Sequence, residues 1–109
     1  MADIIPLRAE CLNELSRTVE AIPFLNQIRT RAGLAATTAT TKETVKLAIE
    51  NERFLELAFE PHRWYDLIRW NKAMGTVPNL TEASRDRILW PIPARELDLN
   101  PNLDQNPTY

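Results

Sequence analysis

Glycine and proline are placed very unevenly along this chain, and their placement constrains the fold most. Among 109 residues there are two glycines, Gly33 and Gly75, whereas five of the eight prolines lie at or after Pro78. A many-stranded β-fold needs glycines in its turns, so residues 1–75 are predicted to form a helical body. Proline interrupts regular helix, so residues 76–109 are predicted to form an extended, Pro-rich tail of the same domain. The expected fold class is therefore all-α, with an irregular C-terminal tail.

Apolar periodicity and helix-end signals predict about four helices in the helical body. They are expected over residues 4–15, 18–33, 41–59 and 62–73. Thr18 is expected to cap the second helix, and Gly33 is expected to stop it in a left-handed conformation. Before the third helix, Thr40 and Glu43 are expected to form a capping box. Two short turns and one loop between four helices favour stacked antiparallel helix pairs.

Charge and cysteine content exclude several classes of protein. Thirteen Lys plus Arg against fifteen Asp plus Glu give a net charge of −2, whereas nucleic-acid binders usually carry a basic excess. The single cysteine excludes an internal disulfide framework and any CxxC metal or redox motif. No apolar run approaches the length of about 18 residues that a membrane span needs. We therefore expect no nucleic-acid partner, and no transmembrane segment, signal peptide or lipobox within this chain itself.

Two carboxylates lie where the third predicted helix should face the core. Its apolar stripe reaches, at helical spacing, Val45, Ala48, Ile49, Glu52, Glu56 and Phe59. Paired carboxylates could serve as the acid and base of a glycoside hydrolase. With many arginines nearby, however, a buried ion-pair network that ties the third and fourth helices together is favoured, and no catalytic residue is expected. The predicted members of this network are Glu52, Arg53, Glu56, Glu60, Arg63, Asp66 and Arg69.

Other residues that could serve in catalysis or ligand binding have simpler structural explanations. Cys11, His62 and Asp66 could form a nucleophilic triad, but Cys11 lies inside a predicted helix with no glycine-rich turn to expose it. Among the aromatic residues, Trp70 and Trp90 are the least constrained and are the candidates for stacking on a glycan, although packing is favoured for both. We expect no metal and no cofactor.

Several segments, in order along the chain, resemble the sequence motifs of the SusD/RagB family. Residues 25–34 (LNQIRTRAGL) are similar to its LNxIRxRAGL signature, and residues 7–15 (LRAECLNEL) resemble the family's preceding helix. Residues 49–60 (IENERFLELAFE) and 62–70 (HRWYDLIRW) together resemble its ERxxELAFEGxRxxDLxRW block. Residues 91–109 are similar to its C-terminal PIPxxEIxxNPxLxQNPGY motif, and the family usually has glycine where this chain has Pro61 and Thr108.

The resemblance implies a tetratricopeptide-like fold of stacked helix pairs that binds ligands without catalysis. Members are lipoproteins on the outer-membrane surface of Bacteroidetes, where they bind glycans or other nutrients for polysaccharide utilisation alongside a TonB-dependent SusC-type transporter. This chain would be the C-terminal portion, and its partners would be that transporter, the N-terminal part of the same protein and a glycan. Self-association of the portion is also expected, because its first helix would expose an apolar side. The alternative is a self-standing tetratricopeptide-like interaction module that binds a protein partner and no glycan.

Overall fold

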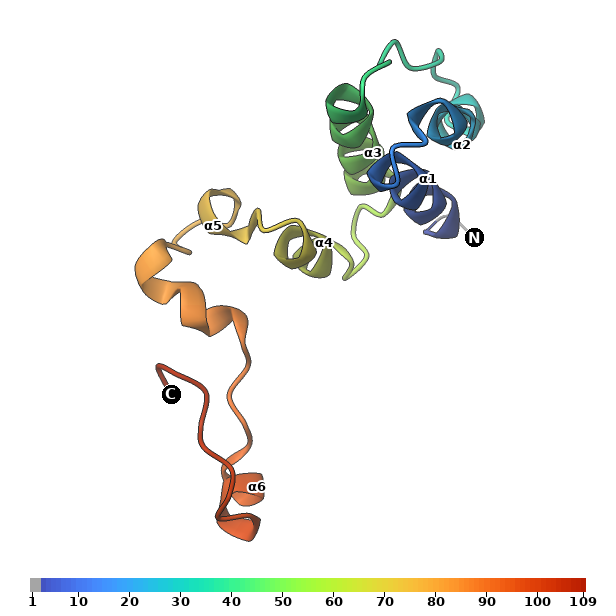
Figure 1. Ribbon diagram of the computed structural model, residues 1–109. Coiled ribbons are helices and arrows are strands. Elements are labelled where there is room, and N and C mark those ends of the chain that lie inside the picture. The colour runs from blue at the N-terminus through green and yellow to red at the C-terminus, as the bar shows by residue number, and fades with distance from the viewer. Residues whose placement is uncertain (1–2) are drawn as a thin grey trace. The chain divides into compact units, whose positions relative to one another are not determined.

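The computed structural model describes residues 3–109, apart from the side chains of residues 82–84 (Figure 1). Its helices are α1 (Ile4–Glu14), α2 (Thr18–Arg31), α3 (Lys42–Glu56), α4 (Arg63–Arg69), α5 (Ala73–Thr76), the 3₁₀ helix η1 (Glu82–Ile88) and α6 (Ala94–Leu99). The described residues contain helices, turns and irregular segments only, which confirms the predicted all-α class. They form two compact units, Met1–Arg63 and Trp64–Tyr109. The predicted division between body and tail at residue 75 stays a prediction.

Helices α1, α2 and α3 pack against one another and form the core of the first unit (Figure 1). The buried apolar side chains at its centre are Ala9, Ala21, Leu25, Val45 and Ile49. Alanine on both α1 and α2 allows these two helices to approach closely, since interaxial distance depends on the side chains at the contact. A core of this size supplies limited hydrophobic stabilisation. Polar contacts between the helices therefore contribute a larger share of the stability of the first unit.

Three helices end in the same way, with a left-handed residue just beyond the helix. Ser16 after α1, Gly33 after α2 and Asn71 after α4 have φ angles of 61°, 73° and 54°. The amide of the next residue then reaches back to a carbonyl of the last turn. These bonds, each 2.8 Å long, run from Arg17 to Leu12, from Leu34 to Arg29 and from Lys72 to Leu67. They are Schellman motifs, which satisfy free carbonyls at a helix C-terminus, and they confirm Gly33 as a left-handed stop.

Both predicted N-caps are wrong. Thr18 is the first residue of α2 instead of its cap, and its hydroxyl donates to Asn13 Oδ1 at 2.8 Å. The capping box before α3 lies one residue later than Thr40, at Thr41 and Thr44. There Thr41 Oγ1 accepts from Thr44 N at 3.2 Å, and Thr44 Oγ1 accepts from Thr41 N at 3.1 Å.

Two predicted helix ends are also too late. Helix α3 ends at Glu56 rather than at Phe59, because Phe59 has a φ of 69° and is fully exposed. Helix α4 ends at Arg69, where the left-handed Asn71 turns the chain. Ala73 therefore begins a separate short helix, α5.

In the second unit, three C-terminal side chains hold the backbone of residues 89–92. The carboxamide of Gln105 accepts from Ile92 N at 2.8 Å and donates to Ile92 O at 2.9 Å. Asn106 Nδ2 donates to the carbonyl of residue 90 at 2.6 Å, and the Tyr109 hydroxyl donates to the carbonyl of residue 89 at 3.2 Å. We call Gln105, Asn106 and Tyr109 the C-terminal clip. It holds an irregular segment in place without a β-ladder.

Replacing Ser16 by glycine is expected to stabilise the first unit by about 0.5–1 kcal/mol, because glycine adopts the left-handed conformation without strain. Urea denaturation measures this change. Gly33→Ala is the matched control: its Cβ would meet open space, but its φ of 73° strains any other residue, so this variant should be destabilised by a similar amount. A neutral or destabilising Ser16→Gly change would contradict this account of the α1–α2 turn.

Candidate functional site

Four charged side chains link the last turn of α2 to the second half of α3. Arg29 bonds to Glu52, and Arg31 bonds to Glu56, each as a hydrogen-bonded ion pair. We call these four residues the α2–α3 ionic cluster. The side chains of Arg29 and Glu52 are 23% and 4% exposed, whereas those of Arg31 and Glu56 are 56% and 16% exposed. Water therefore screens the Arg29–Glu52 pair less than the Arg31–Glu56 pair.

The same end of α2 also holds the loop that leads to α3, residues 32–41. Arg29 Nε donates to Ala35 O at 2.7 Å, so the guanidinium that pairs with α3 also holds this loop. Asn26 Oδ1 accepts from the amide of Thr37 at 2.8 Å. Both side chains therefore hold the loop that runs into α3, and Arg29 also bonds to Glu52 in the second half of that helix.

The observed partners of the predicted ionic residues differ from those that sequence spacing suggested. Glu52 and Glu56 were expected to pair with arginines of the third and fourth helices, and this is wrong because both pair with α2. Arg53 is 3% exposed, and its Nη1 lies 2.7 Å from Asp3 Oδ1 at the start of α1. Spacing along one helix identified charged positions but could not identify partners on other helices.

The other predicted members of the network have local contacts. Glu60 Oε2 lies 3.2 Å from His62 Nε2, and Asp66 Oδ1 lies 2.9 Å from Arg69 Nη2. The guanidinium of Arg63 lies over the ring of Phe54, 4.7 Å from its centroid. The collective role of these residues as a structural network stays a prediction.

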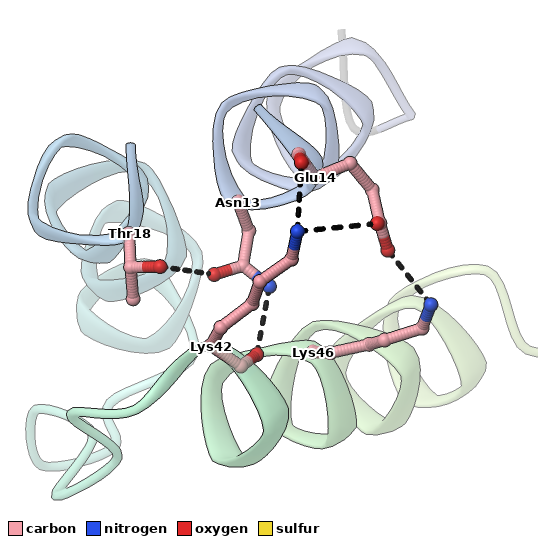
Figure 2. A network of polar contacts seen from close by, with 5 residues as sticks. All are labelled: Asn13, Glu14, Thr18, Lys42 and Lys46. Atoms are coloured by element: carbon pink, nitrogen blue, oxygen red, sulfur yellow. Dashed lines mark hydrogen bonds and ion pairs between the residues drawn. The ribbon is translucent and has the colours of Figure 1, made fainter. Parts of the chain in front are cut away.

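A second polar cluster, which no sequence motif marks, joins the end of α1 to the first turns of α3 (Figure 2). It consists of Asn13, Glu14, Thr18, Lys42 and Lys46, and we call it the polar clamp. Asn13 is 1% exposed, and its carboxamide donates to Lys42 O and accepts from the Thr18 hydroxyl, both at 2.8 Å. Lys42 Nζ donates to Glu14 O at 2.8 Å, and Lys46 Nζ donates to Glu14 Oε1 at 2.7 Å. Asn13 thus connects all three helices of the core.

The charged pair of the polar clamp shifts the titration of both its members. The hydrogen bond from Lys46 lowers the pKa of the Glu14 carboxyl below its usual value, and the same bond raises the pKa of Lys46. Both side chains are largely open to solvent, at 46% and 40% exposure. The pair is therefore expected to contribute no more than about 1 kcal/mol to stability.

The two candidate glycan-stacking residues differ in how much of the ring is accessible. Trp90 is 78% exposed, and its carbonyl is held by the C-terminal clip. Trp70 is half-buried, and the Arg69 guanidinium lies 4.7 Å from its ring centroid. Trp90 is therefore the better placed of the two for contact with a ligand.

The remaining candidates form no catalytic or metal centre that the geometry supports. The expectation that Cys11 packs without being exposed is wrong, because it is a free, exposed thiol on α1. His62 lies beside Glu60. Among the side chains that the structure describes, no three from His, Cys, Asp or Glu gather closely enough to hold a metal ion. In the same part of the chain, no helix combines the length and apolarity that crossing a membrane requires. The expected lack of a metal, a cofactor and an enzymatic activity stays a prediction.

Comparison with known proteins gives one consistent result. A model of the SusD family matches residues 1–80. The SusD-like protein P38 of Formosa agariphila is 39% identical over an alignment of 117 residues, which covers 99% of this chain and 23% of that protein. A second SusD-like protein of this bacterium is 36% identical over 115 residues, covering 94% of this chain and 22% of its own length. The chain thus spans about a quarter of the length of these relatives.

Solved structures show the same likeness. A SusD-like protein from Bacteroides fragilis aligns with a TM-score of 0.84 at 29% identity, covering 99% of this chain and 25% of that one. A SusD superfamily protein from Bacteroides thetaiotaomicron aligns with a TM-score of 0.78 at 35% identity, covering 97% of this chain and 25% of that one. The fold is therefore shared along almost the whole chain.

Arg29→Ala is expected to destabilise the protein by about 3 kcal/mol, because it leaves the buried Glu52 carboxylate without its cation. Arg31→Ala is the matched control and should cost about 1 kcal/mol or less, since Arg31 is mostly exposed. Urea denaturation measures both changes. The double variant Arg29→Ala/Glu52→Ala should cost less than the sum of its single changes. Equal effects of the two arginine substitutions would show that burial does not distinguish the pairs.

The polar clamp should produce a small pH dependence of stability. The pKa of Glu14 is lowered in the folded protein, so its contribution is present above the unfolded value of about 4.3 and is lost as pH falls through the folded pKa. The pKa of Lys46 is raised, so its contribution is present below about 10.4 and is lost as pH rises through the folded pKa.

Glu14→Gln should therefore flatten both the acid and the alkaline limb of the stability profile, by about 1 kcal/mol at most. Urea denaturation at a series of pH values measures this. Lys46→Gln should have a similar effect, and the double variant should add little to either single change. Unchanged limbs in Glu14→Gln would contradict the assignment.

Proposed function

Because the chain belongs to the SusD family, whose model matches residues 1–80, we propose that it is the C-terminal portion of a nutrient-binding lipoprotein on the outer-membrane surface of a Bacteroidetes bacterium. The full-length protein binds a glycan or another nutrient and works with a TonB-dependent SusC-type transporter. Family membership is the observation that carries this proposal, since the relatives cover nearly the whole of this chain.

Within that protein, we assign this portion the role of a scaffold that acts by binding and packing, without catalysis, metal or cofactor. The support comes from its motif residues, whose polar groups are used inside the molecule. Asn26 and Arg29 hold the α2–α3 loop, and Glu52 pairs with Arg29. A carboxylate held by a guanidinium is a poor general acid, which disfavours the alternative of a hydrolase that uses Glu52 and Glu56.

A self-standing interaction module is the second candidate. The observation in its favour is the apolar side chains exposed on α3, where Leu47 and Leu55 are 59% and 56% exposed. Such side chains can bind a protein partner. They can equally be covered by the rest of a longer chain, and the family relationship favours that explanation.

Affinity purification of the full-length protein from its native host distinguishes these candidates. We expect a TonB-dependent transporter to co-purify with it, and we expect protease added to intact cells to digest it. An unrelated surface lipoprotein of the same host, carrying the same tag, serves as the control. Co-purification with a protein inside the cell, or protection from external protease, would contradict the proposal.

The isolated 109-residue chain is expected to bind no soluble glycan tightly. Of its two candidate rings only Trp90 is well exposed, and one ring makes a poor platform for an oligosaccharide. Calorimetric titration with maltoheptaose, xylohexaose and laminarihexaose should give no dissociation constant as low as about 1 μM, which corresponds to about −8 kcal/mol. Micromolar binding that Trp90→Ala abolishes would instead place a glycan site in this portion.

A further inference from the structure

A pocket of about 270 Å³ opens on the first unit between the start of α1 and the end of α2. It is lined by Ile5 of α1 and by Gln27, Ile28 and Arg31 of α2. Ile28 is 3% exposed and Ile5 is half-buried, so apolar side chains line the inside, while the exposed Gln27 and Arg31 add polar groups. We call this feature the α1–α2 groove. Its volume falls below the range of about 300–1,000 Å³ usual for small-molecule sites, and one bulky side chain suits it better.

One turn further along the two helices, beyond the residues that line the groove, an arginine lies over an aromatic ring. Arg8 follows Ile5 by three residues on α1, and Phe24 precedes Ile28 by four on α2, so both lie on the groove side. The guanidinium of Arg8 lies 4.3 Å from the centroid of the Phe24 ring. Arg8 is exposed, so a carboxylate could approach it from solvent. An apolar pocket with a cation beside it suits an amphipathic helix that carries an apolar residue next to an acidic one.

The length of the relatives indicates where such a helix comes from. This chain covers 23% of one SusD-like protein and 22% of another, so about three-quarters of a full-length member lies outside it. A groove formed by two packed helices is most readily filled by a third helix, whose side-chain ridges fit between theirs. The groove also lies near the start of α1, so a helix that precedes α1 would reach it through a short connection.

We propose that the α1–α2 groove docks a helix from the preceding part of the full-length protein, which inserts an apolar side chain beside Ile5 and Ile28 and places a carboxylate near Arg8. This inference rests on the proposed function only in treating the chain as the C-terminal portion of a longer protein. It identifies the surface through which the scaffold portion joins the rest.

A chimera tests the proposal. The matched segment of the Formosa agariphila relative, which is 39% identical, is replaced by this chain. Ile5→Glu should then lower the melting temperature of the chimera at least twice as much as that of the isolated chain, because only the chimera has a docked helix to lose. Val19→Glu is the matched control, since Val19 is 81% exposed at the other end of α2. It should shift both proteins equally. The milder Ile5→Ala and Arg8→Gln should show the same contrast if Ile5→Glu prevents folding.

Three results would overturn the proposal. The first is an equal effect of Ile5→Glu and Val19→Glu on the chimera. The second is a chimera that does not fold although the parent protein does, because the groove would then not accept the helix of a relative. In the third, Ile5→Glu abolishes self-association of the isolated chain in sedimentation and leaves the melting temperature of the chimera unchanged. That result would show that the groove binds a second copy of this chain. None of these results bears on transporter or glycan binding, so failure of this inference and failure of the proposed function are separately detectable.

Discussion

The first unit depends on α3, because polar side chains near both ends of this helix hold the other two helices. Lys42 and Lys46, in its first turns, bond to the C-terminal end of α1 (Figure 2). Arg53, near its other end, bonds to the start of α1, and Glu52 bonds to the end of α2. If α3 slid by one turn, about 5.4 Å, contacts at both ends would break together. A core rich in alanine would resist such a shift much less.

This use of charge also involves residues that suggest an active site in the sequence, because in the structure their charged groups bond to groups on neighbouring helices. A catalytic carboxylate must be reachable by substrate and must exchange a proton during the reaction. Glu52 is 4% exposed and bonded to Arg29, which in turn holds the loop before α3. Removing the charge of Arg29 would therefore disturb the contact of α2 with α3 and its contact with the loop before α3 together.

Much of the fold could be predicted from the sequence, because its signals are local. The scarcity of glycine excluded a β-fold, and Gly33 marked the end of α2 through its own backbone preference. The cap of α3 was misplaced by one residue, because several threonines in a row are equally good candidates. The partners of Glu52 and Glu56 were missed because they lie 23 and 25 residues away on another helix. Asn13 gave a weak signal, a polar residue on the apolar face of α1, whose meaning depends on bonds to α2 and α3.

The two positions at which this chain departs from the family motifs, Pro61 and Thr108, differ in what their backbone requires. Thr108 stands where the family has glycine and keeps a φ of 75°, so a β-branched residue bears strain that glycine would avoid. Pro61 cannot do the same, because its ring holds φ near −65°. The left-handed residue after α3 is instead Phe59, with a φ of 69°, and its side chain points fully into solvent. Glycine would therefore relieve strain at residue 108, whereas at residue 61 proline fits the backbone and the left-handed residue lies two positions before it.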